Sequence, residues 1–590
     1  MEIRESLEAI IDAAIDAARA DGSLQLEEAP EAALERPRDE ANGDWASTVA
    51  LRVSKLAHKS PREIAQIIVD HIPENDMIAS VEIAGPGFIN IRLSDAVLQG
   101  VVREVREEGD NFGRGTIPEG ERYVNLEYVS ANPTGPFHVG HGRWASLGDA
   151  MARVMRHGGY DVYEEYYIND HGNQMDVFGN SVNVRYQQLL GRDVEMPEAC
   201  YGGAYVKDIA QDIIDRDGDK WLSVSDEERV EAFREMAYDM TLKNQREVLA
   251  NFGTTFDKWF SERSLYVEDE NGESAVSRSL DAMREKGYLY EKDGALWFRS
   301  TDLGDDKDRV LIKGDGEATY FMSDVAYHYD KMMRGFDHLI DLWGADHHGY
   351  IKRCECMLEA WGWPGALEVQ LGQLVNLFRD GKAVRMSKRT GEMVTFEELI
   401  DEVGVDATRY LMLSRSADQP IDFDIEVAKK KDASNPVYYV QYAHARICSI
   451  LRKAADEADA AAVEAGGVTM GEAAPPAVEA GEMTMGELAE KIIPEDCDLT
   501  PLTHPSELAL MRKMADFGNL IALAARDRAP FRLTHYAQDL ASLFHQFYTN
   551  CHVLTDDADV QTARLALCDA TRIVLALTLN LLGVSAPVKM

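Results

Sequence analysis

The sequence predicts a multidomain α/β protein: a doubly wound parallel-sheet (Rossmann-like) domain lies between an α+β N-terminal domain and an all-α C-terminal helix bundle. Three observations predict this fold class. A chain of 590 residues, 45% of them hydrophobic, can bury several cores. Strand and helix patterns alternate between residues 113 and 420, as they do in strand-helix-strand units. Beyond residue 420 the apolar periodicity is helical to the last residue of the sequence.

Residues 1–112 are predicted to form the N-terminal domain. Ser60 and Pro61 supply an N-cap and a first-turn proline for the helix "REIAQIIVDHI". The stretch "VEIAGPGFINIRL" follows as two short strands around a Gly-Pro-Gly turn. A helix at about 94–108 closes this domain.

Residues 113–420 carry the parallel-sheet pattern. The strand "RYVNLEYV" is followed by a glycine-containing loop, the long amphipathic helix "GRWASLGDAMARVMRHGG" and the strand "YDVYEEYYI". Residues of about 175–300 are polar and mostly helical in pattern, which predicts an insertion. The sheet pattern returns with "DHLIDLWG", the helix "YIKRCECMLEAWGW" and a single strand "LEVQLGQLVNLF".

Residues 421–590 are predicted to form the helix bundle, as in "NPVYYVQYAHARICSILRKAA" and "TARLALCDATRIVLALTLNLLG". Within it, "VEAGGVTMGE" at 463 is nearly repeated as "VEAGEMTMGE" at 478. The surrounding stretch of about 455–495 is rich in Ala, Gly, Glu and Pro. Such a composition buries little apolar surface, so a disordered insertion is predicted there.

The charge is strongly acidic: 103 Asp and Glu stand against 61 Lys and Arg, for a net charge of −42. The acidic residues are spread along the whole chain, which is typical of the solvated surface of halophilic proteins and suggests a halophilic archaeon as the source. This charge argues against a membrane surface as partner. A nucleic-acid partner requires salt screening or local arginine clusters, because phosphates are otherwise repelled.

The cysteines and the N-terminus predict a cytoplasmic protein. Seven cysteines, without regular spacing beyond Cys354 and Cys356, do not make a disulfide framework in a chain of this length. The segment "MEIRESLEAIIDAAIDAARADG" is an acidic amphipathic helix pattern without a basic region, and no apolar run is long enough to span a bilayer. No export signal is therefore expected.

A zinc site is one interpretation of the two cysteines together with His347 and His348. Thiols at positions i and i+2 of a helix diverge, however, so they do not reach one ion. No protein-bound metal is expected.

The stretch "NLEYVSANPTGPFHVGH", residues 125–141, holds two histidines three apart. A metal site would need a third ligand, and Pro-Thr-Gly-Pro before the pair leaves only His141 in regular helix. A polar loop at a helix start is the simpler interpretation. The stretch nevertheless follows a predicted strand and precedes a helix, where Gly140 permits close backbone approach and the helix N-terminus favours anions.

A second stretch, "AVRMSKRTGEMVT" at 383–395, places three cations within five residues. With "HVGH" it resembles the two signatures of class I aminoacyl-tRNA synthetases, the HIGH and KMSKS motifs. In order along nearly the whole chain, "SANPTGPFHVGH", "YFMSDVAY", "GADHHGY", "MSKRTG" with "DEVGVDATRYLML", and "YVQYAHAR" resemble arginyl-tRNA synthetases. Two positions depart from the second signature: Arg385 stands at its first lysine and Arg389 at its final serine, while Lys388 is retained.

The resemblance implies an enzyme that activates L-arginine with ATP, accompanied by Mg²⁺, and transfers it to tRNA(Arg). His138 and His141 are then expected to stabilise the charge on the phosphates, and Lys388 to grip the β and γ phosphates. The ATP-binding residues implied are Gly140, Gly344, Asp346, His347, Arg385, Met386, Ser387 and Arg389.

The same resemblance implies an arginine pocket. Glu127, Tyr320 and Asp324 would take the guanidinium, and Asn132 the α-amino end. A guanidinium offers donors in a planar fork and requires carboxylates. Taken alone, Glu127 would be a charge at a strand edge and Asp324 a helix N-cap.

For tRNA, the family's N-terminal domain reads the D-loop and its C-terminal bundle binds the anticodon. Phe88 and Asn90 share one face of a strand, as an aromatic to stack on a base and an amide to bond its edge. Phe88 as a core residue is the alternative. Tyr438, Tyr442 and Met590 are the expected anticodon contacts.

Two other functions remain as alternatives. A synthetase-like RNA-binding regulator would lack Lys388 or the histidines, and all three are present. A synthetase for cysteine would need zinc ligands in its pocket, and one for glutamate would need cations where Glu127 and Asp324 stand. The expected partners are therefore tRNA(Arg), L-arginine and ATP, with no membrane, and the protein is expected to be a monomer.

Overall fold

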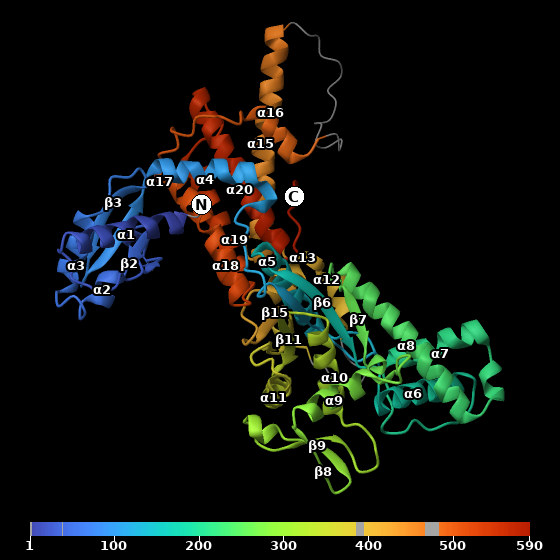
Figure 1. Ribbon diagram of the computed structural model, residues 1–590. Helices are drawn as coiled ribbons and strands as arrows, with labels where there is room; N and C mark the ends of the chain where they lie inside the picture. Colours follow the sequence, from blue (N-terminus) through green and yellow to red (C-terminus); the bar gives the residue numbers. More distant parts are fainter. Residues whose placement is uncertain (1–2, 38, 385–393, 467–482) are drawn as a thin grey trace.

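The computed structural model describes residues 3–37, 39–384, 394–466 and 483–590. Figure 1 shows a central sheet domain, with the N-terminal domain on one side, a helical bundle above and a helical insertion on the other side. In that part of the chain, no helix is long and apolar enough to cross a membrane.

The N-terminal domain is an antiparallel four-stranded sheet, in the order β1-β2-β4-β3, covered by helices. Its strands are β1 (Leu34–Glu35), β2 (Trp45–Ser47), β3 (Ile78–Ala84) and β4 (Phe88–Leu93). Its helices are α1 (Ile3–Ala20), α2 (Val49–Val53), α3 (Pro61–Asp70) and α4 (Asp95–Glu108). Ser60 caps α3 as predicted, since its hydroxyl accepts from the Glu63 backbone N–H.

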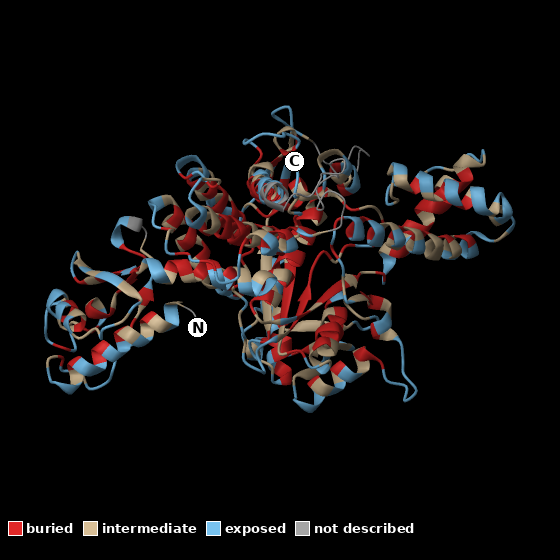
Figure 2. Ribbon diagram, turned by 90° about the horizontal axis from the view of Figure 1, so that it is seen from above, coloured by how far each residue is buried: buried red, intermediate tan, exposed pale blue. Residues whose placement is uncertain are grey.

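The central sheet is parallel throughout, in the order β12-β11-β5-β6-β7. Its strands are β5 (Tyr123–Glu127), β6 (Asp161–Ile168), β7 (Lys258–Ser261), β11 (His338–Gly344) and β12 (Leu367–Gly372). The helices around it are α5 (Val139–His157), α10 (Tyr320–Met333) and α11 (Ile351–Trp361). The strands lie at the buried centre of the molecule in Figure 2. This is the doubly wound parallel sheet that the sequence predicts.

The range 175–300, predicted as mostly helical, contains more than helices. Helices α6 (Asn173–Leu189), α7 (Ala204–Asp217) and α8 (Asp226–Asn251) pack around a core of their own. The chain then supplies β7 to the central sheet, α9 (Ala275–Glu285), and two strands of a separate sheet. That antiparallel sheet consists of β8 (Leu289–Lys292), β9 (Ala295–Phe298) and β10 (Arg309–Ile312). β7 has only four residues, too few to give a clear alternating pattern.

The stretch predicted as one strand, "LEVQLGQLVNLF", is two strands in different sheets. β12 ends at Gly372, where a Cβ would fall 1.8 Å from the Trp144 ring. The next two carbonyls, of Gln373 and Leu374, accept from the buried Arg143 guanidinium. The Leu374 carbonyl also accepts from the Ile421 backbone N–H at 3.2 Å. The chain restarts as β13 (Val375–Arg379), which pairs with β14 (Lys382–Ala383) and β15 (Ile421–Asp424).

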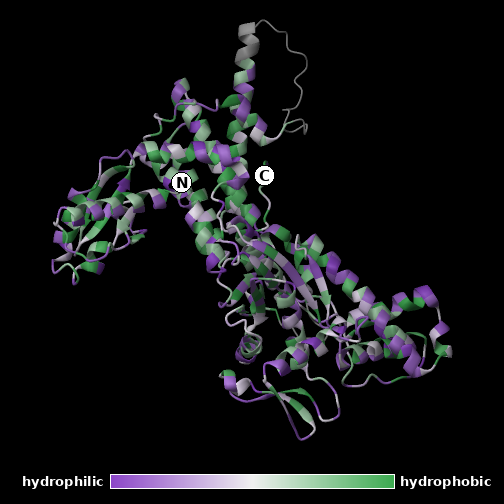
Figure 3. Cartoon of the chain, in the orientation of Figure 1, coloured by the Kyte–Doolittle hydropathy of each residue, from purple (hydrophilic) through white to green (hydrophobic). Residues whose placement is uncertain are grey.

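In the described residues beyond 420 the regular structure is helical as predicted, except at β15 (Ile421–Asp424), which pairs with β13 of the preceding domain. The helices α12 (Phe396–Val403) and α13 (Val405–Met412) come before this region. The region itself contains α14 (Ile425–Ala428), α15 (Pro436–Gly466), α16 (Met485–Ile492), α17 (Pro505–Ala515), α18 (Phe517–Arg526), α19 (Phe531–Asn550) and α20 (Ala558–Leu581). α15 and α16 occupy both ends of the stretch predicted as a disordered insertion, so those ends are ordered helix, and residues 467–482 lie outside the described part. Hydrophilic residues occur on all parts of the chain in Figure 3.

Candidate active site

The order in which the strands are added to the central sheet reverses between β5 and β11. The strand that follows β5 along the chain, β6, lies on one side of β5, and the later β11 lies on the other side. The carboxyl ends of two such strands leave a crevice, where ligands bind in doubly wound sheets. Glu127, the last residue of β5, is the register partner of Asp341 on β11.

His138 and His141 lie at the N-terminus of α5, the helix that follows β5 along the chain. His138 is the N-cap, and its Nδ1 accepts from the Gly140 backbone N–H at 3.1 Å. The His138 backbone N–H donates to Nδ1 of His141 at 3.0 Å, and the two rings stack with centroids 3.7 Å apart. Only His141 lies in regular helix, as predicted. Because Nδ1 of each neutral ring accepts, the ring proton lies on Nε2.

Gly140 is required for this histidine arrangement. A Cβ on it would fall 2.9 Å from Cε1 of His138. Any other residue at this position would displace the His138 ring, because 2.9 Å is too close for two carbon atoms.

Thr395, which ends the second signature stretch, and Phe396, which follows it, lie next to the histidines. Thr395, the N-cap of α12, forms an antiparallel bridge with His138, and the Phe396 N–H donates to the Phe137 carbonyl at 2.9 Å. Arg385, Met386, Ser387, Lys388 and Arg389 lie outside the described residues.

Glu127 is buried and held from both sides. Lys331 Nζ donates to Oε2 of Glu127 at 2.6 Å and to Oδ1 of Asp341 at 2.8 Å. The Ser130 hydroxyl donates to Oε1 of Glu127 at 2.9 Å. Burial raises the pKa of Glu127, Lys331 opposes that rise and Asp341 adds to it. Glu127 is thus a buried acid with a specific partner, not an edge charge.

Asp324 lies on α10, in the second turn, and faces the same group of carboxylates. Burial raises the pKa of Asp324 to about 7; His328 opposes this rise, and Glu262 and Glu127 add to it. The N-cap of α10 is Thr319, so the alternative of Asp324 as a helix cap is wrong. Tyr320, the first residue of α10, is 77% exposed.

The remaining expected ATP and arginine residues lie at the surface. Gly344 ends β11, and Asp346 and His347 follow in the 3₁₀ turn η6 (Ala345–Tyr350), both exposed. Nε2 of His347 lies 3.7 Å from Oδ2 of Asp346. Asn132 is exposed in the loop before α5, and its backbone carbonyl accepts from the Gln245 amide at 3.2 Å.

Sequence reasoning missed four residues of this cluster. Asp341 sits on β11, His328 and Lys331 on α10, and Glu262 begins the 3₁₀ turn η4 (Glu262–Tyr266). One signal was available: positions 320, 324, 328 and 331 share one face of a helix. Glu262 gave no such signal, because only the fold brings β7 to the sheet.

No metal site accompanies these residues in the described part of the chain, where no group of three His, Cys, Asp or Glu side chains could hold an ion. Cys354 and Cys356 are both buried on α11 as free thiols. Cys356 donates to the Leu303 carbonyl at 3.3 Å.

Phe88 and Asn90 share a face of β4, as predicted from their spacing. Phe88 is half-buried and Asn90 is buried. The Asn90 side chain is therefore less accessible than a base-reading amide was expected to be.

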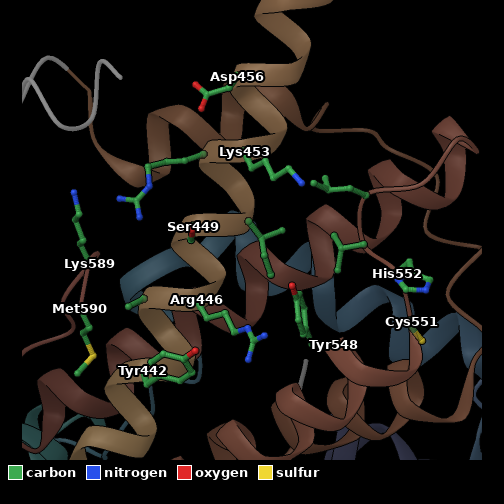
Figure 4. Close-up of a pocket in the computed structure, with 15 residues that line it drawn as sticks. Tyr442, Arg446, Ser449, Lys453, Asp456, Tyr548, Cys551, His552, Lys589 and Met590 are labelled. Carbon is green, nitrogen blue, oxygen red and sulfur yellow. The ribbon is translucent and has the colours of Figure 1, made fainter. Parts of the chain in front are cut away.

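A cavity of about 920 Å³ lies between α15, the end of α19 and the C-terminal residues (Figure 4). Tyr442 and Met590 line it, together with five cationic or imidazole groups, Arg446, Arg452, Lys453, His552 and Lys589. The Arg446 guanidinium lies 4.2 Å from the Tyr548 ring centre. Tyr438 does not line the cavity; its ring stacks on Tyr442 with centroids 6.2 Å apart.

Comparison with known proteins gives three family matches that together span most of the chain. They are "Arginyl tRNA synthetase N terminal domain" at residues 2–93, "tRNA synthetases class I (R), catalytic domain" at 112–447, and "DALR anticodon binding domain" at 484–590.

Two curated relatives are bacterial arginine–tRNA ligases. That of Heliobacterium modesticaldum is 44% identical over 589 residues, covering 100% of this chain and 99% of the relative. That of Listeria monocytogenes serotype 4a is 45% identical over 570 residues, covering 96% of each. The solved arginyl-tRNA synthetase of Thermus thermophilus has the same fold, with a TM-score of 0.70 at 22% identity over 100% of both chains. With a catalytic-domain match over more than half of its length and these full-length relatives, the chain belongs to the arginyl-tRNA synthetase family of class I aminoacyl-tRNA synthetases.

Proposed function

We propose that this chain is an arginine–tRNA ligase, which activates L-arginine with ATP and transfers the arginyl group to the 3′ end of tRNA(Arg), releasing AMP and pyrophosphate. The observation that carries the proposal is the carboxylate cluster at the crevice. Glu127 and Asp324 influence each other's charge there, and the stacked histidines begin α5, the helix that follows the strand of Glu127. The chain belongs to a family that charges tRNA with arginine.

In the first step, a carboxylate oxygen of arginine attacks the α-phosphorus of ATP and pyrophosphate leaves. Negative charge grows on the phosphate oxygens, so catalysis requires positioned donors. His138 and His141 supply Nε2–H donors at the N-terminus of α5, which itself favours anions. Lys388, with Arg385 and Arg389, would hold the departing pyrophosphate; their role rests on the resemblance of the second signature.

For ATP, Gly140 and Gly344 would allow close backbone approach, and Asp346, with His347 beside it, would accept from the ribose hydroxyls. Met386 and Ser387 would contribute from the second signature. Since no described group of three side chains could hold an ion, Mg²⁺ would take most of its oxygen ligands from the triphosphate and water.

For arginine, Glu127 and Asp324 would pair with the guanidinium, Tyr320 would cover it, and Asn132 would hold the α-amino group. Asp324 with a pKa of about 7 is a carboxylate that lacks a full cationic partner. A bound guanidinium would supply that charge with fork geometry. In the second step, the terminal ribose hydroxyl of tRNA attacks the arginyl carbonyl carbon, and AMP leaves.

For tRNA, the cavity of Figure 4 combines aromatic faces with cations, the arrangement that binds unstacked bases and their phosphates. Tyr442 and Met590 are proposed contacts, and Tyr438 supports Tyr442 by stacking. Phe88 and Asn90 on β4 are the proposed D-loop contacts, of which Phe88 is the more accessible.

Further assignments concern the whole chain. We assign residues 1–112 to D-loop binding, 113–420 to catalysis and 421–590 to anticodon binding, in a monomer that works in the cytoplasm. A net charge of −42 supports a salt-rich environment. An archaeal source has no such support, since the curated relatives described above are bacterial.

An aminoacylation assay with each of the standard amino acids and homologous tRNA tests the proposal. We expect charging with arginine alone. Charging with cysteine or glutamate, or tRNA binding without any charging, would replace the proposal by one of the two alternatives.

A further inference from the structure

A lysine without any solvent contact lies against one of the carboxylates of the proposed arginine pocket. Lys331, on the last turn of α10, is 0% exposed. Its ammonium contacts the carboxylates of Glu127, at 2.6 Å, and Asp341, at 2.8 Å. A buried ammonium is costly, so it persists only where its partners and hydrogen bonds compensate.

The pairing of β5 with β11 places the carboxylates of Glu127 and Asp341 at adjacent positions. Glu127 and Asp341 are register partners on adjacent parallel strands. Two buried carboxylates at such positions cannot both ionise without a nearby cation, because their charges repel in a medium of low polarity. Lys331 is the lysine that contacts both.

Lys331 also lies on the face of α10 that lines the pocket. Tyr320, Asp324, His328 and Lys331 follow one another at intervals of four, four and three residues, which aligns them along one side of a helix. The face begins at the exposed Tyr320 and ends at the fully buried Lys331. Helix α10 therefore carries both Asp324, a proposed pocket carboxylate, and Lys331, whose ammonium binds Oε2 of Glu127.

Hydrogen bonds fix the orientation of the cluster. Oε2 of Glu127 accepts from Lys331, while Oε1 accepts from the Ser130 hydroxyl. A carboxylate oxygen has two lone pairs, so Oε1 can accept a second donor. Nε2 of His328 lies 3.0 Å from Oδ2 of Asp341, which gives Asp341 a second contact of its own.

We propose that Lys331 is a positioning residue for arginine recognition: its ammonium anchors Oε2 of Glu127 and neutralises Asp341, so that an ionised Glu127 offers Oε1 to the guanidinium. The inference rests on the proposed function, since it assigns the role of Lys331 through the arginine pocket.

Burial and Asp341 raise the pKa of Glu127, and Lys331 makes the largest contribution against this rise. Burial opposes the charge on Lys331, but Asp341, Glu127 and Glu165 together raise the pKa of its ammonium, so it stays protonated. Burial also works against ionised Asp341, and Lys331 and His328 lower its pKa below the usual value. Without the lysine, Glu127 and Asp341 would share a proton, and a protonated Glu127 is no charge partner for a guanidinium.

A double-mutant cycle tests whether Lys331 acts through Glu127. The variants are Lys331→Met, Glu127→Gln and the two combined, each assayed for KM of arginine, KM of ATP and kcat in tRNA charging. Lys331→Met and Glu127→Gln should each raise the KM for arginine about 100-fold and leave the KM for ATP within about threefold. The KM for arginine of the combined variant should lie within about threefold of that of Glu127→Gln, because without the Glu127 carboxylate the lysine has no group to position.

The combined variant also protects the test against misfolding, because it removes one buried positive and one buried negative charge together. If Lys331→Met does not fold, the combined variant still tests the inference, because a KM for arginine well above that of Glu127→Gln would overturn it. Lys243→Met, at an exposed position on α8, is the matched control and should leave all three constants unchanged.

Three results would overturn the inference: an unchanged KM for arginine in Lys331→Met, an equal rise in both KM values, or effects that multiply in the combined variant. Failure of the proposed function is distinguishable, because the unmutated protein would then not charge tRNA with arginine at all.

Discussion

At the scale of single residues, Asp324 is the clearest recognition element of the proposed pocket. It lies among Glu262, Glu127 and Asp341, and burial with their charges raises its pKa to about 7. His328 alone among the named neighbours opposes this rise. A carboxylate in such surroundings is stabilised by a ligand that brings a positive charge.

Replacing Asp324 by asparagine should therefore affect arginine more than a neutral analogue. Asp324→Asn keeps the shape but leaves the guanidinium short of one charge, at a cost on the order of 2 to 5 kcal/mol. Citrulline, which is neutral but similar in shape, should be rejected strongly by the unmutated pocket and far less, relative to arginine, by the variant. The measurement is the ratio of activation rates for the two compounds, with tRNA present. An identical ratio in both proteins would remove Asp324 from recognition.

The same residue should make arginine binding depend on pH. In the arginine-free protein Asp324 holds its proton below about pH 7, and binding a guanidinium displaces that proton. Affinity should thus fall about fivefold from pH 7 to pH 6 and be level above pH 8, since a single group of that pKa titrates in this range. Calorimetric titration at each pH measures it. Asp324→Asn should flatten the profile, and a profile that stays equally steep would assign the pH dependence to another group.

At the scale of elements, α5 joins the two halves of the site. Its Arg143 is fully buried and donates to five backbone carbonyls on two other segments. These belong to Gln373, Leu374, Ser416, Ala417 and Gln419. The helix that begins at the histidines is therefore fastened to the start of β13 and to the loop before β15.

Arg143→Met should destabilise the central domain on the order of 2 to 4 kcal/mol, because the carbonyls of Gln373 and Gln419 would lose the donor described for them. Urea unfolding followed by tryptophan fluorescence measures the change in the free energy of unfolding. Arg284→Met is the matched control on α9, where the side chain is exposed and the expected change is below about 0.5 kcal/mol. A loss in Arg143→Met no larger than in the control would show that the carbonyls find other donors.

At the scale of the whole molecule, the net charge is −42, so the acidic side chains repel one another and also repel the phosphates of tRNA. Salt should stabilise the folded chain, because raising it from about 0.1 M to about 1 M shortens the screening length from about 10 Å to about 3 Å. Charging should rise with KCl before it falls, whereas an ordinary tRNA-binding protein only weakens. Sucrose at equal osmolality is the control and should not reproduce the rise. Charging that declines steadily from dilute buffer upward would contradict a halophilic protein.

The sequence by itself determined the fold class, the position of His141 alone in regular helix and the order of the signatures. These depend on local chemistry: a proline before a helix, a glycine beside a histidine, and periodic apolar residues that each element carries alone. The placement of Tyr320 and Asp324 on one helix face also follows from local sequence, because the two residues are four apart.

Only the tertiary structure decided that the stretch after residue 367 splits into two strands, that β7 joins the central sheet, and that Lys331, Asp341 and Glu262 surround the proposed pocket. The register of β5 against β11 joins residues more than 200 positions apart, from Glu127 to Asp341. No local pattern encodes such a contact, because the charge of a buried lysine depends on which carboxylates the folded sheet brings to it.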